Sequence, residues 1–313
     1  MQDLIIYDII GDIHGYADEL VELLEQSGYT KTGSVFRHPK RKAVFCGDFI
    51  DRGPQILDVI HIVRNMVEQQ AAHAVMGNHE FNAIAFHTEC SEQPGSWYRP
   101  HTSRNTQQHQ ATLDQCRDHE LDEALDWFRA LPIALDLGSV RVVHACWDPK
   151  QIALLETRLI EQDRFNPSFL AEAADSEHPV GNAIERVLKG PEVTLPDNAT
   201  VVDKEGHTRR RVRIRWFESP EGRSLGSYAF PVIPGLEGMA VPASVRPSPY
   251  PRKAPPLFIG HYWLDGRCDP LLGPNLACLD LSVAKGGKLC GYRFNGESVL
   301  NPHAFVKVSA RGC

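Results

Sequence analysis

The sequence has no apolar run long enough to cross a bilayer. Its longest, at residues 4–10, is interrupted by Asp8, and no basic leader precedes it, so we expect neither a transmembrane helix nor a signal peptide. Basic residues are in deficit, since 33 Lys and Arg against 40 Asp and Glu give a net charge of −7. This balance disfavours a protein that binds nucleic acid through its overall field. We therefore expect a cytoplasmic protein without a membrane partner or a stable nucleic-acid partner.

Closely spaced cysteine pairs are also missing. The eight cysteines are spread over 313 residues without a Cys-x-x-Cys pair, so the sequence indicates neither a zinc knuckle nor a disulfide framework. We interpret them as reduced thiols. No internal repeat is visible. Hydrophobic residues make up 42% and charged residues 23% of the chain, which is typical of a globular protein and excludes a fibrous or mostly disordered one.

Strands and helices alternate in the first part of the chain. Residues 4–10 and 42–45 predict two strands, and the spacing of leucines over residues 20–24 predicts a helix between them. A second helix is expected from residue 56 to 67, followed by a third strand at 73–75. Each strand runs into a loop rich in Gly, Asp, Asn and His. In α/β sheets, loops at the carboxyl ends of strands are where ligands bind.

The rest of the chain is less regular. We expect irregular structure at residues 89–110, a helix at 113–130 and two strands within 133–144. Further helices are expected at 153–162, 168–175 and 182–189, an extended proline-rich loop at 241–256, and closing strands at 257–259, 275–281 and 288–294.

Five short motifs carry most of the chemically reactive side chains, and each follows a predicted strand. They supply carboxylates, an amide oxygen and imidazoles, which together suit divalent first-row metals. In chain order they are Gly11-Asp12-Ile13-His14-Gly15, Gly47-Asp48-Phe49-Ile50-Asp51-Arg52-Gly53, Gly77-Asn78-His79-Glu80, His144-Ala145-Cys146 and Gly260-His261.

The spacing of these residues favours two metal ions. Asp12 and His14 are alternate residues of an extended segment, so they share a face and can bind one ion together. Asp48 can bridge to a second ion. A shared carboxylate holds two cations roughly 3.5 to 4 Å apart, the spacing that two-metal hydrolases use on phosphoryl groups.

The ordered motifs resemble those of the calcineurin-like metallophosphoesterases. The nearest resemblance is to the phosphoprotein phosphatase family, with its bacterial Ser/Thr protein phosphatase and symmetrical diadenosine tetraphosphatase branches. It covers residues 7–88, 140–148 and 257–294 well and residues 89–139 and 149–256 loosely. The resemblance implies an α/β fold, a four-layer sandwich of two central mixed sheets flanked by helices. Residues 1–313 would form this single domain, with an insertion or cap at about residues 149–255.

The resemblance also implies a ligand set for two divalent ions. Manganese is our first choice, with iron, zinc, cobalt and nickel as alternatives, because mixed oxygen and nitrogen ligands accept all of them. The first ion would be bound by Asp12, His14 and Asp48. The second ion would be bound by Asp48, Asn78, His144 and His261.

Acid–base and substrate-binding roles follow from the same resemblance. His79 would be the general acid that protonates the leaving oxygen, and Asp51 would orient it. Arg52 would clamp the phosphate with its planar, permanently charged guanidinium. A second clamp would come from the arginine run at residues 209–215, where Arg213 and Arg215 are both candidates. The alternative for this run is an edge strand kept soluble by its charges.

Taken singly, these motifs have simpler explanations. A Gly-Asp-x-His-Gly segment is often a strand-to-helix turn, with Asp as the helix cap, and Asp-Arg-Gly is often an ion-paired turn. Their occurrence together and in family order favours the metal site. His144 and His261 are weaker alone and are supported because each ends an apolar strand.

Some residues depart from the family pattern. Cys146 stands where glycine is usual and adds a side chain beside the second metal site. Tyr262 separates His261 from Trp263, whereas the dinucleotide branch has Gly-His-Trp. Stacking on a nucleobase and packing in the core are both open to these two aromatic residues, with core packing favoured for the tryptophan. Asp51 argues against the dinucleotide branch, which commonly lacks this acid.

Three functions are compatible with these residues. The first is a metal-dependent phosphomonoesterase of the phosphoprotein phosphatase type, acting by in-line attack of a metal-bridging hydroxide. The alternative is a symmetrical bis(5'-nucleosyl)-tetraphosphatase. A catalytically silent scaffold is the third possibility, and the complete ligand set argues against it, because a silent relative has no need of these residues. A nucleic-acid phosphodiesterase is a lesser possibility, because the negative net charge argues against it. The partner would be a phosphorylated protein, a small phosphoester or a nucleotide, and the oligomeric state stays open.

Overall fold

The computed structural model describes residues 6–196, 199–202, 208–243, 245 and 249–311. Residues 4 and 5, where we expected the first strand to begin, lie outside this range, as do residues 244 and 246–248 of the proline-rich loop. No helix within the described residues combines the length and the apolar character that a membrane crossing requires.

The first sheet is built around three parallel strands. β1 (Ile6–Ile10) pairs in parallel with β4 (Arg41–Phe45), which pairs in parallel with β5 (Ala72–Ala74). On its other side β1 pairs antiparallel with β16 (Lys288–Phe294), so the sheet is mixed. The antiparallel strands β15 (Asp280–Leu281) and β17 (Phe305–Ser309) complete it beside β16.

The second sheet is also mixed. Its central strand β12 (Leu257–Ile259) pairs in parallel with β7 (Arg141–Val143) and with β14 (Leu276–Cys278). The antiparallel strands β6 (Ala134–Asp136) and β13 (Leu271–Gly273) form its edges.

The hydrophobic core lies between the two sheets. Phe258 of β12 contacts two aromatic residues of β16, with ring centroids 5.0 Å from Tyr292 and 6.5 Å from Phe294. Such interleaved aromatic rings bury large apolar areas. The same core extends to buried residues of the flanking helices, so the two sheets and their helices pack as one unit.

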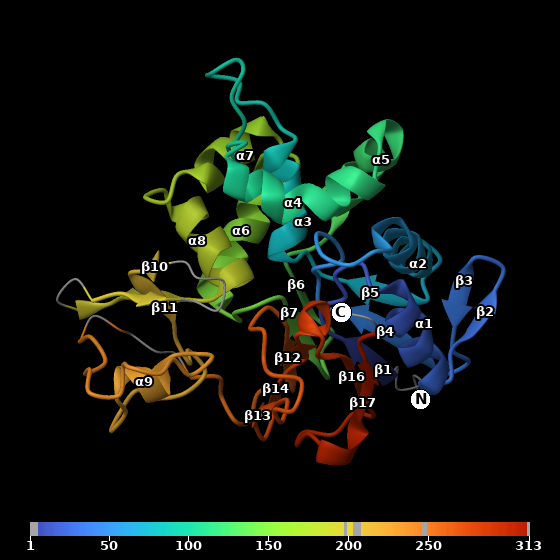
Figure 1. Cartoon of the computed structure of the whole chain (residues 1–313). Helices are drawn as coiled ribbons and strands as arrows, with labels where there is room; N and C mark the ends of the chain where they lie inside the picture. The colour runs from blue at the N-terminus through green and yellow to red at the C-terminus, as the bar shows by residue number, and fades with distance from the viewer. Residues whose placement is uncertain (1–5, 197–198, 203–207, 244, 246–248, 312–313) are drawn as a thin grey trace.

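Helices flank both sheets (Figure 1). α1 (Ala17–Gln26) packs on β16 and β17, and α2 (Ile56–Glu68) packs on β5 and on the small hairpin of β2 (Thr30–Thr32) and β3 (Val35–Arg37). α3 (Asn78–Phe86) begins directly after β5 and packs on α5 (Asp118–Ala130). Beside the second sheet, α8 (Pro179–Lys189) accepts backbone hydrogen bonds from the loop after β7 and packs on α6 (Pro149–Glu161) and α7 (Pro167–Ala174).

This arrangement confirms the predicted α/β fold of two mixed sheets between helices. The strands after residues 133, 257 and 288 and the helices near 153, 168 and 182 are found close to their predicted places. Among the strands of these two sheets, β13 and β17 were missed. The three late helices each begin at a proline, the residue whose fixed backbone angle suits the first helical turn.

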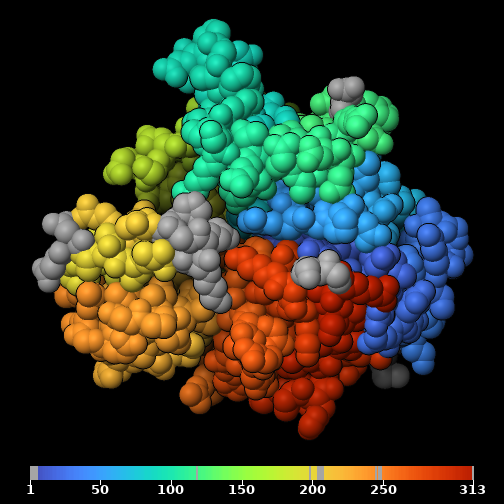
Figure 2. All heavy atoms as spheres, viewed as in Figure 1, coloured from blue at the N-terminus to red at the C-terminus, as the bar shows by residue number. Residues whose placement is uncertain are grey.

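The region at about 190–250 forms one side of the molecule, coloured yellow to orange in Figure 2. It contains the short strands β8 (Glu192–Thr194) and β11 (Arg211–Arg213), the pair β9 (Val201–Val202) and β10 (Thr208–Arg209), and α9 (Leu225–Tyr228). A small core of its own holds it together, formed by Leu195, Val212, Leu225 and Leu236. The assignment of residues 149–255 to a cap on a single domain stays a prediction.

One expectation was wrong. Residues 103–115, which we expected to be partly irregular, form the helix α4 (Ser103–Gln115), and a break at Cys116 and Arg117 separates it from α5. The fully buried residues of α4 are His109 and Thr112, which are both polar. A helix whose buried face is polar lacks the apolar period that a sequence analysis detects.

A buried ion pair ties the first sheet together at the start of β4. The Arg41 guanidinium donates to Asp8 Oδ2 at 2.8 Å, to Asn295 Oδ1 at 2.7 Å, and to the carbonyl oxygens of Tyr7 and Phe294 at 2.7 and 2.8 Å. One side chain thus links β1, β4 and the end of β16. Because the Asp8 carboxylate is buried, it depends on this partner.

We predict that Arg41→Ala lowers the free energy of unfolding by about 3–5 kcal/mol, because it leaves a buried carboxylate without its main partner. The measurement is urea denaturation followed by circular dichroism. Arg267→Ala is the control, since the Arg267 side chain is 90% exposed and pairs with Asp265, which lies two residues away. A loss for Arg41→Ala no greater than that of the control would contradict the prediction.

Candidate metal centre

The five motifs meet where strands of both sheets end. Those of the first sheet follow β1, β4 and β5, and those of the second sheet follow β7 and β12. Parallel strands direct their carboxyl ends to the same edge, which explains why residues far apart in sequence converge. All six predicted metal ligands are buried there: Asp12, His14, Asp48, Asn78, His144 and His261.

The Asp48 carboxylate lies at the centre of this cluster. Its Oδ2 atom is 3.7 Å from His14 Nε2, 3.3 Å from His144 Nε2 and 3.9 Å from His79 Nε2. Its other oxygen, Oδ1, accepts the backbone N–H of His79 at 3.0 Å. One oxygen is therefore anchored, and the other faces imidazoles from three different loops.

The hydrogen bonds of two imidazoles direct a lone pair into the cluster. His14 Nδ1 lies 2.9 Å from the carbonyl oxygen of Ile50, and His144 Nδ1 lies 2.8 Å from that of Cys46. A carbonyl oxygen only accepts, so each Nδ1 carries the proton and donates it. In the neutral rings, Nε2 of both histidines is then free to bind a metal, as is usual for histidine ligands whose other nitrogen is fixed by a backbone carbonyl.

Without a cation, the cluster contains more hydrogen-bond acceptors than hydrogen-bond donors. His144 Nε2 is 3.2 Å from Asn78 Oδ1 as well as close to Asp48 Oδ2. Burial opposes protonation of His144, but the Asp48 carboxylate outweighs it and raises the pKa of His144 to about 10. The structure therefore favours positive charge at the place where the second ion was expected.

Further buried atoms lack a hydrogen-bond partner among the described residues. They are Asp12 Oδ1, His14 Nε2 and both ring nitrogens of His261. Buried polar atoms without partners are rare and costly, so four of them in one cluster indicate a missing partner. Burial, together with the charges of Arg213 and His144, holds the pKa of His261 well below its usual range. The ring stays neutral, as metal binding requires.

Atoms able to bind a metal fall into two groups that share Asp48, and one group includes His79, which was expected to be the general acid and not a ligand. One group is His14, Asp48 and His79, and the other is Asp48, His144 and His261, with the atoms of each group within 4.8 Å of one another. The shared aspartate is the arrangement that a bridging ligand needs. The residues present therefore fit two divalent ions, and we keep the individual ligand assignments as proposals.

Asp12 belongs to neither group. Its Oδ2 accepts the backbone N–H of His261 at 2.9 Å, while Oδ1 stays buried and unpaired. Burial and the nearby Asp280 carboxylate raise the pKa of Asp12 well above its usual range. A bound cation would offset both effects, because its charge favours the ionised carboxylate.

The backbone of the site adopts conformations that ordinary residues avoid. Of the nine non-glycine residues with positive φ in the described chain, five belong to the site: His14 (51°), Asp48 (55°), Asp51 (83°), His261 (71°) and Trp263 (51°). Each costs of the order of 1 to 3 kcal/mol and persists only where the surroundings fix it. Such clustering is typical of functional sites.

Close packing explains two of the motif glycines. A side chain at Gly77 would clash with Asp48 Oδ1, and one at Gly260 would clash with Asp12 Oδ1. Both motifs therefore need glycine so that the chain passes directly against a ligand carboxylate.

Glu80 braces the cluster, a role that our sequence analysis did not assign. Its buried carboxylate accepts backbone N–H groups of Asp48 and Phe49 at 2.8 Å each and of Gly77 at 2.9 Å. It thereby holds the loop after β4 against the start of α3. Its position three residues after Gly77, as in a capping box, was the available signal.

The proposed acid–base pair is formed. His79 Nδ1 lies 2.6 Å from Asp51 Oδ2, and both side chains are buried. The Asp48 and Asp51 carboxylates outweigh burial and raise the pKa of His79 above its usual value. His79 Nε2 remains directed at the cluster, 3.9 Å from Asp48 Oδ2. His79 thus differs from His14 and His144, because its Nδ1 donates to a carboxylate instead of a backbone carbonyl.

The candidate phosphate-binding arginines have different surroundings. Arg52 is exposed beside the cluster, with its guanidinium carbon 5.5 Å from the ring centroid of Trp263. Arg213 donates to the carbonyl oxygen of Lys189 at 2.9 Å and is close enough to lower the pKa of His261. Arg215 instead lies over the Phe230 ring, at 5.0 Å. Arg213 is therefore the candidate whose charge acts on His261, and its role in binding phosphate stays a proposal.

Aromatic residues near His261 have separate roles. Tyr262 is buried, accepts from Trp216 Nε1 at 3.0 Å and donates to the carbonyl oxygen of Ala145 at 3.1 Å, so it is a core residue. Trp263 is partly exposed and stacks on His14, with ring centroids 5.3 Å apart. Core packing was expected for Trp263, but its ring forms part of the rim of the cluster.

The cysteines near the ligands are buried. Cys46 and Cys146 are free thiols, as are the other cysteines within the described residues; Cys313 lies outside them. Burial raises the pKa of both thiols. The backbone N–H of Cys146 donates to the carbonyl oxygen of Val187 at 3.1 Å, which fixes the loop after β7 against α8.

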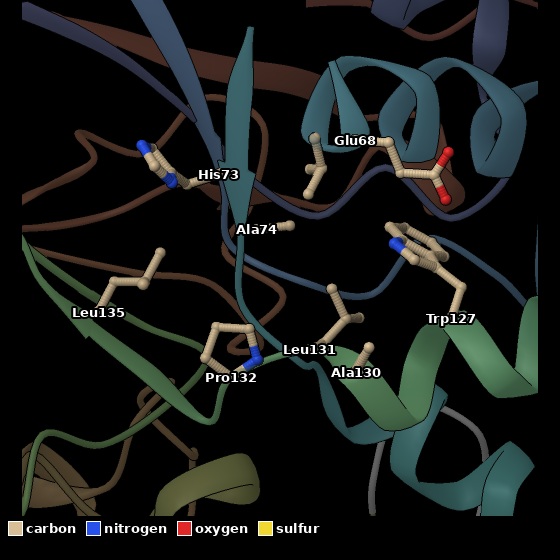
Figure 3. Close-up of a pocket in the computed structure, with 9 residues that line it drawn as sticks. Glu68, His73, Ala74, Trp127, Ala130, Leu131, Pro132 and Leu135 are labelled. Carbon is tan, nitrogen blue, oxygen red and sulfur yellow. The ribbon is translucent and has the colours of Figure 1, made fainter. Parts of the chain in front are cut away.

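A separate pocket lies between α2, β5 and the segment after α5, and contains none of the candidate ligands (Figure 3). It is lined mainly by apolar side chains, among them Ala74, Trp127, Leu131, Pro132 and Leu135, with His73 at its edge. Glu68 and His73 are its polar lining residues, and none of the expected catalytic residues lines it.

Several named proteins are similar to part of this chain. A protein from a Geobacillus species, named asymmetrical bis(5'-nucleosyl)-tetraphosphatase PrpE, is 36% identical over 126 residues, which cover 40% of this chain and 42% of the relative. Proteins of the same name from Halalkalibacterium halodurans and Bacillus subtilis are 47% and 46% identical over 74 residues, covering 23% of this chain and 30% of each relative. The chain thus spans less than half the length of these relatives.

Solved structures resemble the whole chain at low sequence identity. A protein serine/threonine phosphatase from Saccharomyces cerevisiae is 13% identical, with a TM-score of 0.48, and the match covers 100% of this chain and 81% of that one. A cold-active protein-tyrosine phosphatase from a Shewanella species is 14% identical with a TM-score of 0.48, and the match covers 99% and 83%.

The family itself is shown by a profile of the calcineurin-like phosphoesterases, which matches residues 7–177, more than half of the chain. This range contains the motifs after β1, β4, β5 and β7, and the structure adds a cluster of His and Asp side chains suited to divalent metals. The chain belongs to the calcineurin-like phosphoesterase family.

Proposed function

We propose that the protein hydrolyses phosphate monoesters of alcohols, including phosphorylated side chains of proteins, as phosphoprotein phosphatases do. The observation that carries this proposal is the buried His79–Asp51 pair beside the metal cluster. A positioned acid matters most when the leaving oxygen is a poor leaving group, as an alkoxide is, because that oxygen must gain a proton as the bond to phosphorus breaks. A phosphate leaving group needs this help much less.

In this proposal, the metal-binding residues hold two divalent ions. Asp12, His14 and Asp48 would hold one divalent ion, and Asp48, Asn78, His144 and His261 the other, with manganese as our first choice of metal. When bound, two such ions polarise phosphoryl oxygens and supply the hydrolytic nucleophile by lowering the pKa of water.

The other residues bind substrate and move one proton. Asp51 accepts a hydrogen bond from His79 Nδ1–H and so orients the ring. The raised pKa of His79 favours the doubly protonated ring, whose Nε2–H can give its proton to the leaving oxygen. Arg52 and Arg213 would bind the non-bridging phosphate oxygens from two sides. Their guanidinium groups suit tetrahedral oxyanions because they donate several fixed hydrogen bonds.

A second candidate function is hydrolysis of dinucleoside polyphosphates. The relatives named above favour it, and their names point to asymmetrical cleavage rather than the symmetrical cleavage that the motifs first indicated. The partly exposed Trp263 ring beside Arg52 also favours it, because an indole can stack on a nucleobase. A silent scaffold is disfavoured, since both the ligand cluster and the acid pair are intact.

A substrate panel tests the proposed function. Purified protein with manganese is offered a phosphoserine peptide, p-nitrophenyl phosphate and diadenosine tetraphosphate, and kcat/KM is measured for each. We expect the two monoesters to be hydrolysed with inorganic phosphate as the product. A preference of several orders of magnitude for diadenosine tetraphosphate would replace the proposal by the second candidate.

The shared position of Asp48 predicts a loss of both ions on substitution. Asp48→Asn keeps the shape of the side chain but removes the negative charge shared by the two sites, so we expect metal content to fall from two ions toward none and kcat to fall by at least about 100-fold. Elemental analysis and kinetics on p-nitrophenyl phosphate measure both. Asp126→Asn, at a side chain 79% exposed, is the control. Full activity of Asp48→Asn with both metals bound would refute the bridging role.

The arginine run offers a direct comparison. We expect Arg213→Ala to raise KM for p-nitrophenyl phosphate about tenfold, the effect of losing one charge-assisted hydrogen bond, with little change in metal content. Arg211→Ala is the control on the same strand, because its side chain is 63% exposed and pairs with Glu192. Equal values of KM for both variants and the unaltered protein would remove Arg213 from the site.

A further inference from the structure

The Asp51 carboxylate receives more hydrogen bonds than the acid pair requires. His79 Nδ1 donates to Oδ2, while His109 Nδ1 and the Thr112 hydroxyl both donate to Oδ1, and each of the three distances is 2.6 Å. Hydrogen bonds from both histidines outweigh burial and lower the pKa of Asp51. Both oxygens are therefore occupied, and the carboxylate has one orientation available.

Thr112 also holds the Asp51 backbone. The Asp51 N–H donates to Thr112 Oγ1 at 3.1 Å, while the same hydroxyl donates to Asp51 Oδ1. Asp51 has a φ of 83°, a conformation that costs a non-glycine residue free energy unless neighbours fix it. A single threonine thus fixes both the main chain and the side chain of a strained residue.

His109 is itself held in place. Because a carboxylate only accepts, His109 Nδ1 carries a proton, and its Nε2 lies 3.1 Å from Nε2 of the half-buried His87. The His109 ring also contacts the Phe86 ring, with centroids 5.2 Å apart. The Nδ1–H donor toward Asp51 is therefore fixed by contacts on the other side of the ring.

Both residues come from α4, outside the five motifs. Because they are three positions apart, they share a helix face, and they are the fully buried residues of this helix. A helix that served packing alone would bury apolar side chains on this face. Here the buried face consists of two donors directed at one carboxylate.

We propose that His109 and Thr112 are positioning residues for the general acid, acting on His79 through Asp51. The inference rests on the proposed function of His79. In the step concerned, the bond between phosphorus and the leaving oxygen breaks, its electron pair stays on that oxygen, and the oxygen takes the His79 Nε2 proton while water supplies the new oxygen on phosphorus. By fixing Asp51, α4 fixes the direction of that Nε2–H.

Two matched pairs of variants test the proposal. His109→Phe keeps the ring and loses the donor, whereas His109→Asn keeps an N–H donor near the same place. Thr112→Val keeps the shape and loses the hydroxyl, whereas Thr112→Ser keeps it. His119→Gln is the control, because this histidine side chain is 83% exposed on α5. Thermal unfolding by circular dichroism checks that each variant is folded.

The measurement is kcat on two aryl phosphates that differ in their leaving group. Phenyl phosphate needs protonation of its leaving oxygen, whereas p-nitrophenyl phosphate, with a far better leaving group, does not. For His109→Phe and Thr112→Val we expect kcat on phenyl phosphate to fall about 10-fold or more and kcat on p-nitrophenyl phosphate to change less than about 2-fold, because lost general-acid catalysis affects only the poor leaving group. His109→Asn and Thr112→Ser should retain most activity on both.

Three outcomes would count against these ideas. An equal fall on both substrates would show that α4 supports the fold alone, and no fall on phenyl phosphate would show that Asp51 needs neither residue; either result overturns the inference. If the unaltered protein hydrolyses neither aryl phosphate, the proposed function fails instead.

A spectroscopic measurement tests the inference independently of activity. In the zinc-loaded protein, the proton between His79 Nδ1 and Asp51 should give a low-field NMR signal that is absent from His79→Gln. We expect this signal to move or broaden in His109→Phe and Thr112→Val and to stay unchanged in His119→Gln. An unchanged signal in both donor-removing variants would overturn the inference.

Discussion

The convergence of buried lone pairs on the Asp48 carboxylate is the constraint on which the site depends. Oδ2 of Asp48 faces three imidazole nitrogens within 3.9 Å, and two of those rings have their protons engaged by backbone carbonyls on the far side. A buried anion among acceptors is unfavourable unless positive charge is supplied. The family's metal chemistry follows from this: the protein assembles ligands that cations, and little else, can satisfy.

The loops that hold these ligands have strained backbone conformations, and buried hydrogen bonds stabilise them. The loops that carry Asp48, Asp51 and His261 have backbone angles that ordinary residues avoid. Each is fixed by a buried polar partner: Glu80 binds the N–H of Asp48, Thr112 binds that of Asp51, and Asp12 binds that of His261. The polar groups that would otherwise destabilise a core are thus used to fix the geometry of the loops. Such preorganisation is what electrostatic catalysis depends on.

Much of this was predictable from sequence, for a physical reason. A strand followed by a loop of Gly, Asp and His is a local pattern, and parallel strands place such loops at one edge of a sheet. The meeting of the motifs at one edge followed from that rule, whereas the two mixed sheets were implied by the family resemblance. The helix α4 did not follow, because its buried face is formed by His109 and Thr112 and so has no apolar period. Glu80 was named in the third motif, but its role in holding the loop after β4 was not predicted.

The sequence by itself determined which chemical groups are available and which strand ends present them, since these depend on residue type and short-range spacing. Only the tertiary structure decided which of these groups contact one another. Asp48 Oδ2 faces three histidines, Arg213 approaches His261 while Arg215 lies over Phe230, and α4 fixes Asp51. These choices join residues far apart in the chain, and they depend on side-chain packing and burial that no local pattern encodes.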